Sequence, residues 1–140
     1  SSLVSLIKNN LPNLNFVGFY MAKEVKSEVN NSLTNKYELK DGQILQIGVY
    51  NSDILATPVI EYGKGVVGTC WELSKTIIEE DVSKCKNYIA CDDVTKSEIC
   101  VPLFSKNDIF LGVLDIDSTE LNNFDNVDKE FLEKLLIMVA

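Results

Sequence analysis

The chain has 140 residues, of which 46% are hydrophobic and 24% are charged, as expected for one ordinary globular domain. Its formal net charge of -8 argues against a nucleic-acid partner, because binding to a phosphate backbone needs clustered basic side chains. No apolar run reaches the roughly 18 residues of a transmembrane helix, and no basic-then-apolar leader opens the sequence, so we expect a cytoplasmic protein without a membrane partner.

The first half of the chain predicts a short helix followed by two strands. Residues 2–10 carry apolar side chains at helical spacing, and Pro12 ends that pattern. Residues 15–22 and 44–50 are rich in aromatic and β-branched side chains, as buried strands are. The stretch between them, residues 24–42, is polar and without a clear period. We expect it to be a long, flexible insertion.

The second half predicts a short helix, three strands and a final helix. A short helix is expected over residues 69–74 and a strand over residues 76–79, followed by polar, turn-like residues 81–88. Two apolar runs joined by a short polar turn then predict a hairpin, and a helical apolar pattern follows over residues 125–139. The strands of this hairpin are expected over residues 98–104 and 109–117. Because the strands are too close in sequence for parallel crossovers, we expect a single α+β domain over residues 1–140, with an antiparallel sheet and helices packed on one face.

A glycine-rich motif precedes the expected short helix. Residues 63–68 read G-x-G-x-x-G, the spacing of a dinucleotide-binding loop. That site requires a full helix before the next strand, and seven residues between Gly68 and Thr76 are too few. The motif is better interpreted as a tight loop whose backbone can approach a ligand closely.

The expected hairpin brings acidic residues together. If residues 105–108 form the turn, Phe104 pairs with Ile109, and Glu98 then lies opposite Asp115. Directly opposed residues point to the same face of a sheet.

Two further residues share this face. Asp117 lies two residues beyond Asp115, and Cys100 lies two beyond Glu98, so strand alternation points all four the same way. Three carboxylates on one face repel each other unless a cation, a proton or water compensates. The sequence leaves three interpretations open: a solvated strand end, a divalent metal site, or a pocket for a small ligand that carries an ammonium group.

Cys91 precedes the first acidic strand by several residues, so a loop can bring it over the same face. Its neighbours Asp92 and Asp93 would raise its pKa, because like charges oppose thiolate formation. Nearby lysines would lower it, and the sequence does not decide between the two effects: Lys84, Lys86 and Lys96. All four cysteines, Cys70, Cys85, Cys91 and Cys100, lack C-x-x-C spacing, and the chain has no histidine. Cys-His nucleophiles and the common zinc motifs are therefore excluded, and no metal site is predicted from these residues.

These motifs follow one another as in GAF domains of the free methionine-(R)-sulfoxide reductase family. The matching segments are NFVGFY (15–20), GKGVVGT (63–69), IACD (89–92), SEI (97–99), VPL (101–103), LDIDS (114–118) and NNFDNVD (122–128). The resemblance covers nearly the whole chain except the insertion at residues 24–42. It implies a GAF fold, with helices on one side of a central antiparallel sheet and a loop-covered ligand pocket on the other.

The resemblance also implies a reaction, the reduction of free L-methionine (R)-sulfoxide to methionine without a cofactor. In that family the cysteine that matches Cys91 attacks the sulfoxide sulfur and becomes a sulfenic acid. A second cysteine then forms a disulfide, and thioredoxin restores the two thiols.

The same resemblance assigns the pocket walls. The carboxylates that match Glu98, Asp115 and Asp117 would hold the polar substrate. An aromatic wall matching Phe16 and Tyr20 would pack against its methylthio group.

Two departures from the family pattern concern the partner cysteines. Thr57 and Val67 occupy the positions where family enzymes carry them. Cys70, just after the glycine motif, is the first candidate for a resolving thiol, and Cys85 is the second. Cys100 is expected in the pocket wall or the core.

The departures leave two alternatives to an internal resolving cysteine. A small external thiol such as glutathione would regenerate Cys91 directly. Otherwise the chain is a catalytically impaired GAF module that binds a small amino-acid-like ligand, or that forms a homodimer through its terminal helices.

Overall fold

The computed structural model describes residues 2–25, 37–85 and 94–139, and these form an antiparallel sheet with helices on both faces. The six strands lie in the order β3-β2-β1-β6-β5-β4. Their bounds are β1 Leu14–Glu24, β2 Gln43–Ser52, β3 Val59–Ile60, β4 Ile77–Glu79, β5 Ser97–Phe104 and β6 Phe110–Ser118. The predicted α+β class with an antiparallel sheet is confirmed.

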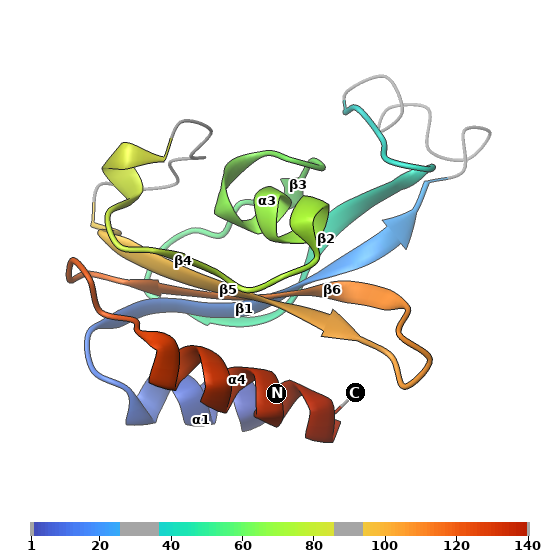
Figure 1. The fold of residues 1–140 in the computed structure, drawn as a ribbon. Coiled ribbons are helices and arrows are strands. Elements are labelled where there is room, and N and C mark those ends of the chain that lie inside the picture. The colour runs from blue at the N-terminus through green and yellow to red at the C-terminus, as the bar shows by residue number, and fades with distance from the viewer. Residues whose placement is uncertain (1, 26–36, 86–93, 140) are drawn as a thin grey trace.

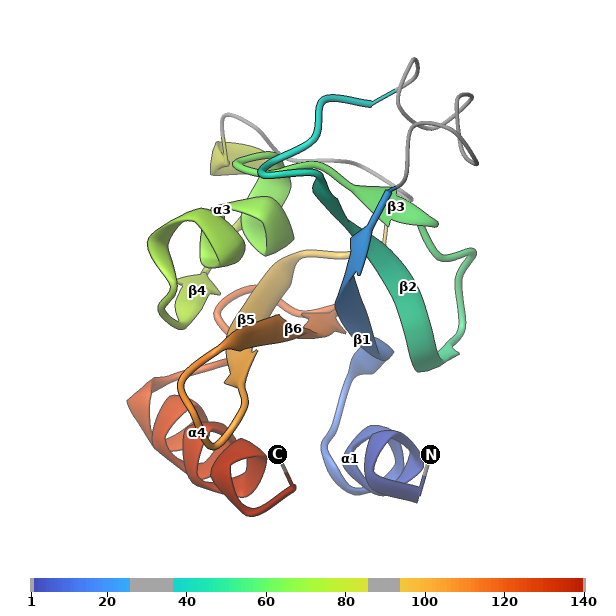
Figure 2. The ribbon, with the colours of Figure 1, turned by 90° about the vertical axis from the view of Figure 1, so that its right-hand side faces the viewer.

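The helices divide between the two faces of the sheet. Helices α1 (Ser2–Asn10) and α4 (Asn126–Val139) cover one face, as Figures 1 and 2 show. Helix α3 (Gly65–Leu73) lies over the opposite face, and a short 3-10 helix, η1 (Val82–Lys84), follows β4. The helices expected at the two ends of the chain are therefore present on one face. Among the described residues, no helix is long and apolar enough to cross a membrane.

Strand alternation produces two separate clusters of buried side chains. Val17, Ile99 and Leu114 point toward α1 and α4 and pack in an apolar core with Leu132 and Leu136 of α4. The alternate residues of the same strands point toward α3 and contribute to a second cluster, which includes Tyr20, Cys100, Val113, Cys70 and Trp71. Each central strand is therefore buried on both faces.

Helix α3 begins earlier than the sequence predicts. The helix was expected from residue 69, but it starts at Gly65, so the second half of the glycine motif forms its first turn. Gly63 and Gly65 have positive φ angles of 75° and 63°, as expected for a tight loop. Gly68 lies inside the helix, where an added Cβ atom would be 2.5 Å from the carbonyl oxygen of Glu61. Glycine at this position allows α3 to pack directly against the segment before it.

The hairpin between β5 and β6 has a different register from the one expected. Glu98 pairs with Asp117, and Asp115 pairs with Cys100, so the predicted pairing of Glu98 with Asp115 is wrong by two residues. Ile109 belongs to the turn, where its carbonyl oxygen accepts a hydrogen bond from the Ser105 amide at 2.8 Å. A bulge follows.

The pairing of Phe104 with Phe110 differs by one residue from the expected pairing with Ile109, and a β-bulge in β6 adds the second residue of the difference. Phe104 pairs with Phe110, but Leu103 pairs with Gly112, which leaves Leu111 as an extra residue in β6. Because a shift of two preserves alternation, the predicted placement of the carboxylates on one face is still correct.

The remaining expectations concern the loops. Strand β3 was not predicted, because two residues carry too little pattern. The ends of the expected insertion at 24–42 contain the last residue of β1 and an isolated bridge between Lys40 and Gln43, and residues 26–36 lie outside the described part. Residues 82–84 form η1 within the expected turn region, and residues 86–93 also lie outside the described part.

Candidate functional site

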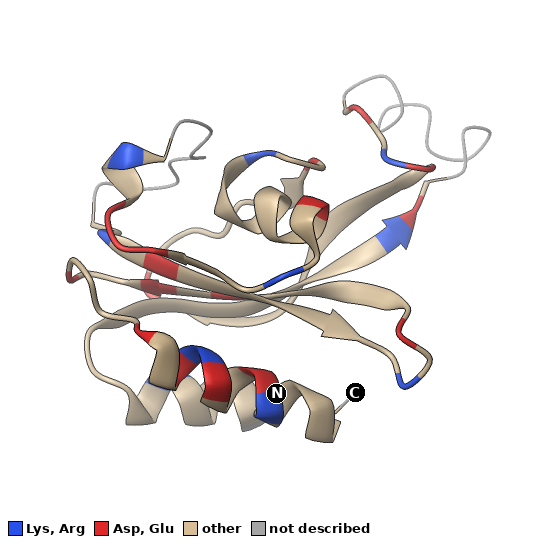
Figure 3. Ribbon diagram, in the orientation of Figure 1, with Lys and Arg blue, Asp and Glu red and all other residues tan. Residues whose placement is uncertain are grey.

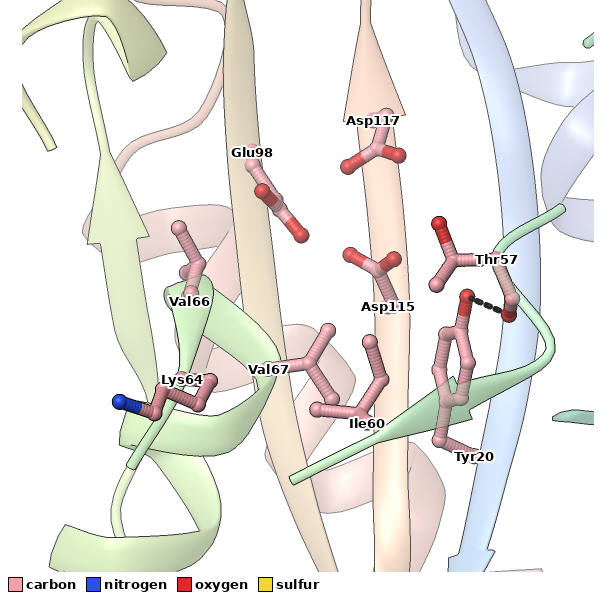
Figure 4. Close-up of a pocket in the computed structure, with 10 residues that line it drawn as sticks. Tyr20, Thr57, Ile60, Lys64, Val66, Val67, Glu98, Asp115 and Asp117 are labelled. Atoms are coloured by element: carbon pink, nitrogen blue, oxygen red, sulfur yellow. Dashed lines mark hydrogen bonds between the residues drawn. The ribbon is translucent and has the colours of Figure 1, made fainter. Parts of the chain in front are cut away.

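A pocket lies between α3 and the sheet, with about 350 Å³ of empty space including its mouth. Three carboxylates from β5 and β6 line it on one side, and valines of α3 line it on another, as Figure 4 shows. Its lining consists of Tyr20, Thr57, Ile60, Lys64, Gly65, Val66, Val67, Glu98, Asp115 and Asp117. Most of that space is open to solvent, and the enclosed part of the cavity is about 30 Å³.

The carboxylates converge because of strand pairing. Glu98 and Asp117 are opposed in the β5–β6 ladder, and Asp115 lies two residues before Asp117 on the same strand. Their side chains are only 4%, 9% and 4% exposed, respectively. Figure 3 shows acidic segments on β5 and β6 within the sheet, whereas lysines lie at strand ends, in loops and on helices. The pocket thus concentrates negative charge away from bulk water.

This burial changes the acidity of the cluster. Burial raises the pKa of Glu98 well above its usual value, and the charges of Asp115 and Asp117 raise it further. Burial also raises the pKa of Asp115, although hydrogen bonds with Glu98, Asp117 and Cys100 partly oppose that rise. The cluster therefore retains a proton most readily on Glu98, and an incoming cation would stabilise its ionised members.

Cys100 lies directly beneath the carboxylates. Its Sγ donates to Glu98 Oε2 and to Asp115 Oδ1, both at 3.4 Å. Its side chain is fully buried, and burial together with the neighbouring carboxylates raises the pKa of the thiol well above its usual value. The Cys100 Sγ and one carboxylate oxygen each of Glu98 and Asp115 lie within 4.8 Å of one another, a spacing compatible with a bound cation. Cys100 is a protonated core residue in contact with the pocket carboxylates.

Of the two predicted aromatic wall residues, Tyr20 lines the pocket among the described residues and Phe16 does not. The Tyr20 hydroxyl donates to the Thr57 carbonyl oxygen at 3.0 Å. Phe16 stacks against Tyr20 with 6.3 Å between ring centroids and against Tyr50 with 6.0 Å. That Phe16 packs against the methylthio group of the substrate stays a prediction.

The two positions at which the resemblance expects partner cysteines both face this pocket. Thr57 and Val67 are lining residues, which places the two departures from the family pattern in the site itself. Lys64 and Val66 of the glycine motif also line it, as does Ile60, which no sequence motif marks. Apolar side chains before and within a short helix carry no chemical signal in the sequence. Lys64 is the exposed N-cap residue of α3.

The cysteines among the described residues differ in access. Cys70, the first predicted resolving thiol, belongs to α3 and is fully buried, and burial, together with Asp115, raises the pKa of its thiol strongly. Cys85, the second candidate, is half-buried at the end of η1. The predicted nucleophile, Cys91, lies outside the described residues. Of the two candidate resolving thiols, Cys85 is therefore the more accessible.

Comparison with protein-family models gives no match. Among curated proteins, the chain is 40% identical over 126 residues to the free methionine-R-sulfoxide reductase of Saccharomyces cerevisiae, covering 90% of this chain and 61% of that protein. It is 33% identical over 132 residues to the free methionine-R-sulfoxide reductase of Escherichia coli, covering 94% of this chain and 68% of that protein. The chain thus spans less than two thirds of the yeast relative.

Solved structures of a GAF domain and of a free methionine-R-sulfoxide reductase are also similar to this chain. A GAF domain structure is 39% identical with a TM-score of 0.79, and the match covers 99% of this chain and 72% of that one. The free methionine-R-sulfoxide reductase of Neisseria meningitidis in complex with its substrate is 29% identical with a TM-score of 0.79, over 99% of this chain and 72% of that one. Similarity in sequence and in fold thus spans nearly all of the chain. The chain belongs to the free methionine-R-sulfoxide reductase family and has a GAF fold.

Proposed function

We propose that this protein reduces free L-methionine (R)-sulfoxide to methionine, with Cys91 as the attacking thiol. The observation that carries the proposal is the cluster of Glu98, Asp115 and Asp117 in the wall of a small, partly apolar pocket. A free amino acid presents an ammonium group, which such a cluster stabilises, whereas a methionine inside a peptide does not. The substrate-complex structure of a relative supports the same substrate class.

The two walls of the pocket suit the two ends of this substrate. The ammonium group would lie against Asp115 and Asp117, and the methylthio end would pack between Tyr20 and the valines of α3. Glu98, whose pKa is raised most clearly, would hold the proton that the sulfoxide oxygen needs as its bond to sulfur breaks.

The proposed reaction balances with one thiol and one sulfoxide. The Cys91 sulfur attacks the sulfoxide sulfur and forms an S–S bond. The protonated oxygen then moves to the Cys91 sulfur as its bond to the substrate sulfur breaks, and cleavage of the S–S bond releases methionine and leaves Cys91 as a sulfenic acid. The proton donated by Glu98 to the oxygen is replaced by the proton that the thiol loses. A second thiol then attacks the sulfenic acid, which releases water and forms a disulfide.

The second thiol is proposed to be Cys85 or a small external thiol, with thioredoxin reducing the resulting disulfide. Cys85 is half-buried, while Cys70 is fully buried and its thiol resists ionisation. A reducing cytoplasmic compartment, expected from the sequence, would supply either reductant.

The test is turnover of each sulfoxide epimer with dithiothreitol as reductant. We expect the wild-type protein to produce methionine from the free R-sulfoxide and not from the S-sulfoxide, and we expect Cys91→Ser to produce none. Cys85→Ser is the matched control, because dithiothreitol can replace an internal resolving thiol. Full activity of Cys91→Ser, or no consumption of the R-sulfoxide by the wild type, would disprove the proposal.

A second candidate function is a binding module without catalysis, for which Thr57 and Val67 in place of the family's partner cysteines are the motivation. Such a module would bind free methionine sulfoxide, measured by calorimetry, and release it unchanged after long incubation with reductant. Turnover by the wild-type protein would exclude this alternative.

A further inference from the structure

We propose that Cys100 is a positioning residue for the acidic pocket, because its thiol donates hydrogen bonds that orient Glu98 and Asp115 and divide their roles. This inference rests on the proposed function, since it assigns Asp115 to the substrate's ammonium group and Glu98 to proton donation.

The sheet places this thiol where an apolar side chain would remove one of the hydrogen-bond donors to Asp115. Cys100 is two residues from Glu98 on β5 and directly opposite Asp115 on β6, so all three side chains point to the pocket face. The Sγ atom is 3.4 Å from Glu98 Oε2 and 3.4 Å from Asp115 Oδ1, within the range of a sulfur hydrogen bond. One S–H cannot donate fully to both acceptors, so the thiol alternates between them or shares its proton.

The thiol can only act as a donor in this position. Cys100 is fully buried, and the titratable groups facing it are Glu98 on its own strand, Asp115 and Asp117 on β6, and Cys70 on α3. Burial and these neighbours raise the pKa of the thiol, so it stays protonated while it contacts the carboxylates. A nucleophilic or redox role for this sulfur is accordingly disfavoured.

The Cys100 thiol favours the state in which Asp115 is ionised and Glu98 is protonated. A hydrogen bond from Cys100 stabilises the ionised form of Asp115 and lowers its pKa relative to the same site without the bond. Glu98 then holds the shared proton, because its own pKa is raised by burial and by the charge of Asp115. Without the thiol the two carboxyl groups compete more evenly for one proton. Asp115 is then ionised less often, so it offers a negative charge to the ammonium group of the substrate less often.

The test compares Cys100→Ala with Cys100→Ser, which are similar in size and differ in the donor. Carboxyl carbons are labelled with 13C, and Asp115 is titrated by NMR. We expect its pKa to rise in Cys100→Ala and to return toward the wild-type value in Cys100→Ser. Cys70→Ala is the control for loss of a buried thiol, because the hydrogen-bond partners of Asp115 among the described residues are Glu98, Asp117 and Cys100, and loss of Cys70 should not raise the Asp115 pKa.

A kinetic arm tests the consequence for substrate. In Cys100→Ala the KM for the free sulfoxide should rise roughly threefold to tenfold, the loss expected for one modest hydrogen bond, and kcat should change less. Cys100→Ser should restore most of KM.

The outcomes separate this inference from the proposed function. Equal Asp115 titration in the Ala and Ser variants, or in Cys100→Ala and the wild type, would overturn the role of Cys100 whether or not the protein is active. A wild-type protein that turns over no sulfoxide would disprove the proposed function, and the titration would still decide the inference.

Discussion

The two faces of strand β6 show how one strand serves two purposes. Leu114 and Ile116 are fully buried and point to the apolar core beneath α1 and α4. Asp115 and Asp117 alternate with them, are almost as buried, and point to the pocket beneath α3. The first face stabilises the fold through apolar burial, whereas the second buries carboxylates at a cost in stability.

The comparison indicates that stability and function are separable at adjacent residues. The face covered by α1 and α4 has no buried charge among its described core residues. Substitutions there should lower the free energy of unfolding and leave the pocket intact. Substitutions of the pocket carboxylates by neutral residues of similar shape should affect ligand binding and leave stability equal or higher. The following variants test this separation, beginning with the largest expected effect.

Leu114→Ala should have the largest effect, a loss of roughly 3–4 kcal/mol in the free energy of unfolding, because it opens a cavity in a fully buried site. Denaturant unfolding measures this change. Affinity of the folded protein for free methionine sulfoxide, measured by calorimetry well below the unfolding midpoint, should stay within about twofold of wild type. A proportionate fall in affinity would mean that the two faces are coupled.

Asp115→Asn, one residue away, should have the opposite pattern. The substitution keeps the shape of the side chain and removes the charge, so affinity for the sulfoxide should fall by roughly 30-fold, about 2 kcal/mol. The free energy of unfolding should not decrease, because a buried carboxyl with a raised pKa has been replaced by a neutral amide. Unchanged affinity would remove Asp115 from the ligand site.

Gly68→Ala tests how α3 is held over the pocket. The added Cβ would meet the Glu61 carbonyl oxygen at 2.5 Å, so α3 must move away from the preceding segment. We expect a loss of about 1–2 kcal/mol in the free energy of unfolding and weaker sulfoxide binding, since Val66 and Val67 would move with the helix. Thr69→Ala is a nearby control on the same helix. Unchanged stability and binding would show that the close approach of α3 is not required.

Glu98→Gln should give the smallest change, a gain of roughly 1 kcal/mol in stability that depends on pH. The folded-state pKa of Glu98 lies above its unfolded value near 4.5, so the folded state binds more protons above that pH. The free energy of unfolding of the wild type therefore falls as pH rises from about 4.5 to the raised pKa, and the loss is complete above it. Melting curves at pH 4 and pH 8 should show the advantage of Glu98→Gln at pH 8, and an equal difference at both values would contradict the burial effect.

The sequence predicts more of this site than of the loops around it. Alternation along 98–104 and 109–117 is sufficient to place three carboxylates on one face, because a pairing error of two residues preserves the side-chain direction. The bulge at Leu111 was not predictable, since the residue has no distinctive property that marks it. The start of α3 was missed because glycines at residues 65 and 68 usually indicate a loop.

The cysteines show the limit of prediction from spacing. Cys70 follows the glycine motif and looked suited to a resolving role, but the helix turns its side chain toward the sheet, where it is fully buried. Cys100 was expected in the wall or the core, and its contact with both carboxylates emerges only from the β5–β6 register. Burial of a single side chain depends on tertiary packing that no local pattern specifies.

NMR titration of the labelled protein with free L-methionine (R)-sulfoxide tests directly whether the acidic pocket binds the substrate. We expect large shifts for the carboxyl carbons of Glu98, Asp115 and Asp117 and for amides at the start of α3. We expect small shifts for α1 and α4. Saturating shifts confined to the α1 and α4 face, or no shifts at the three carboxyl groups, would contradict the assignment of the pocket as the substrate site.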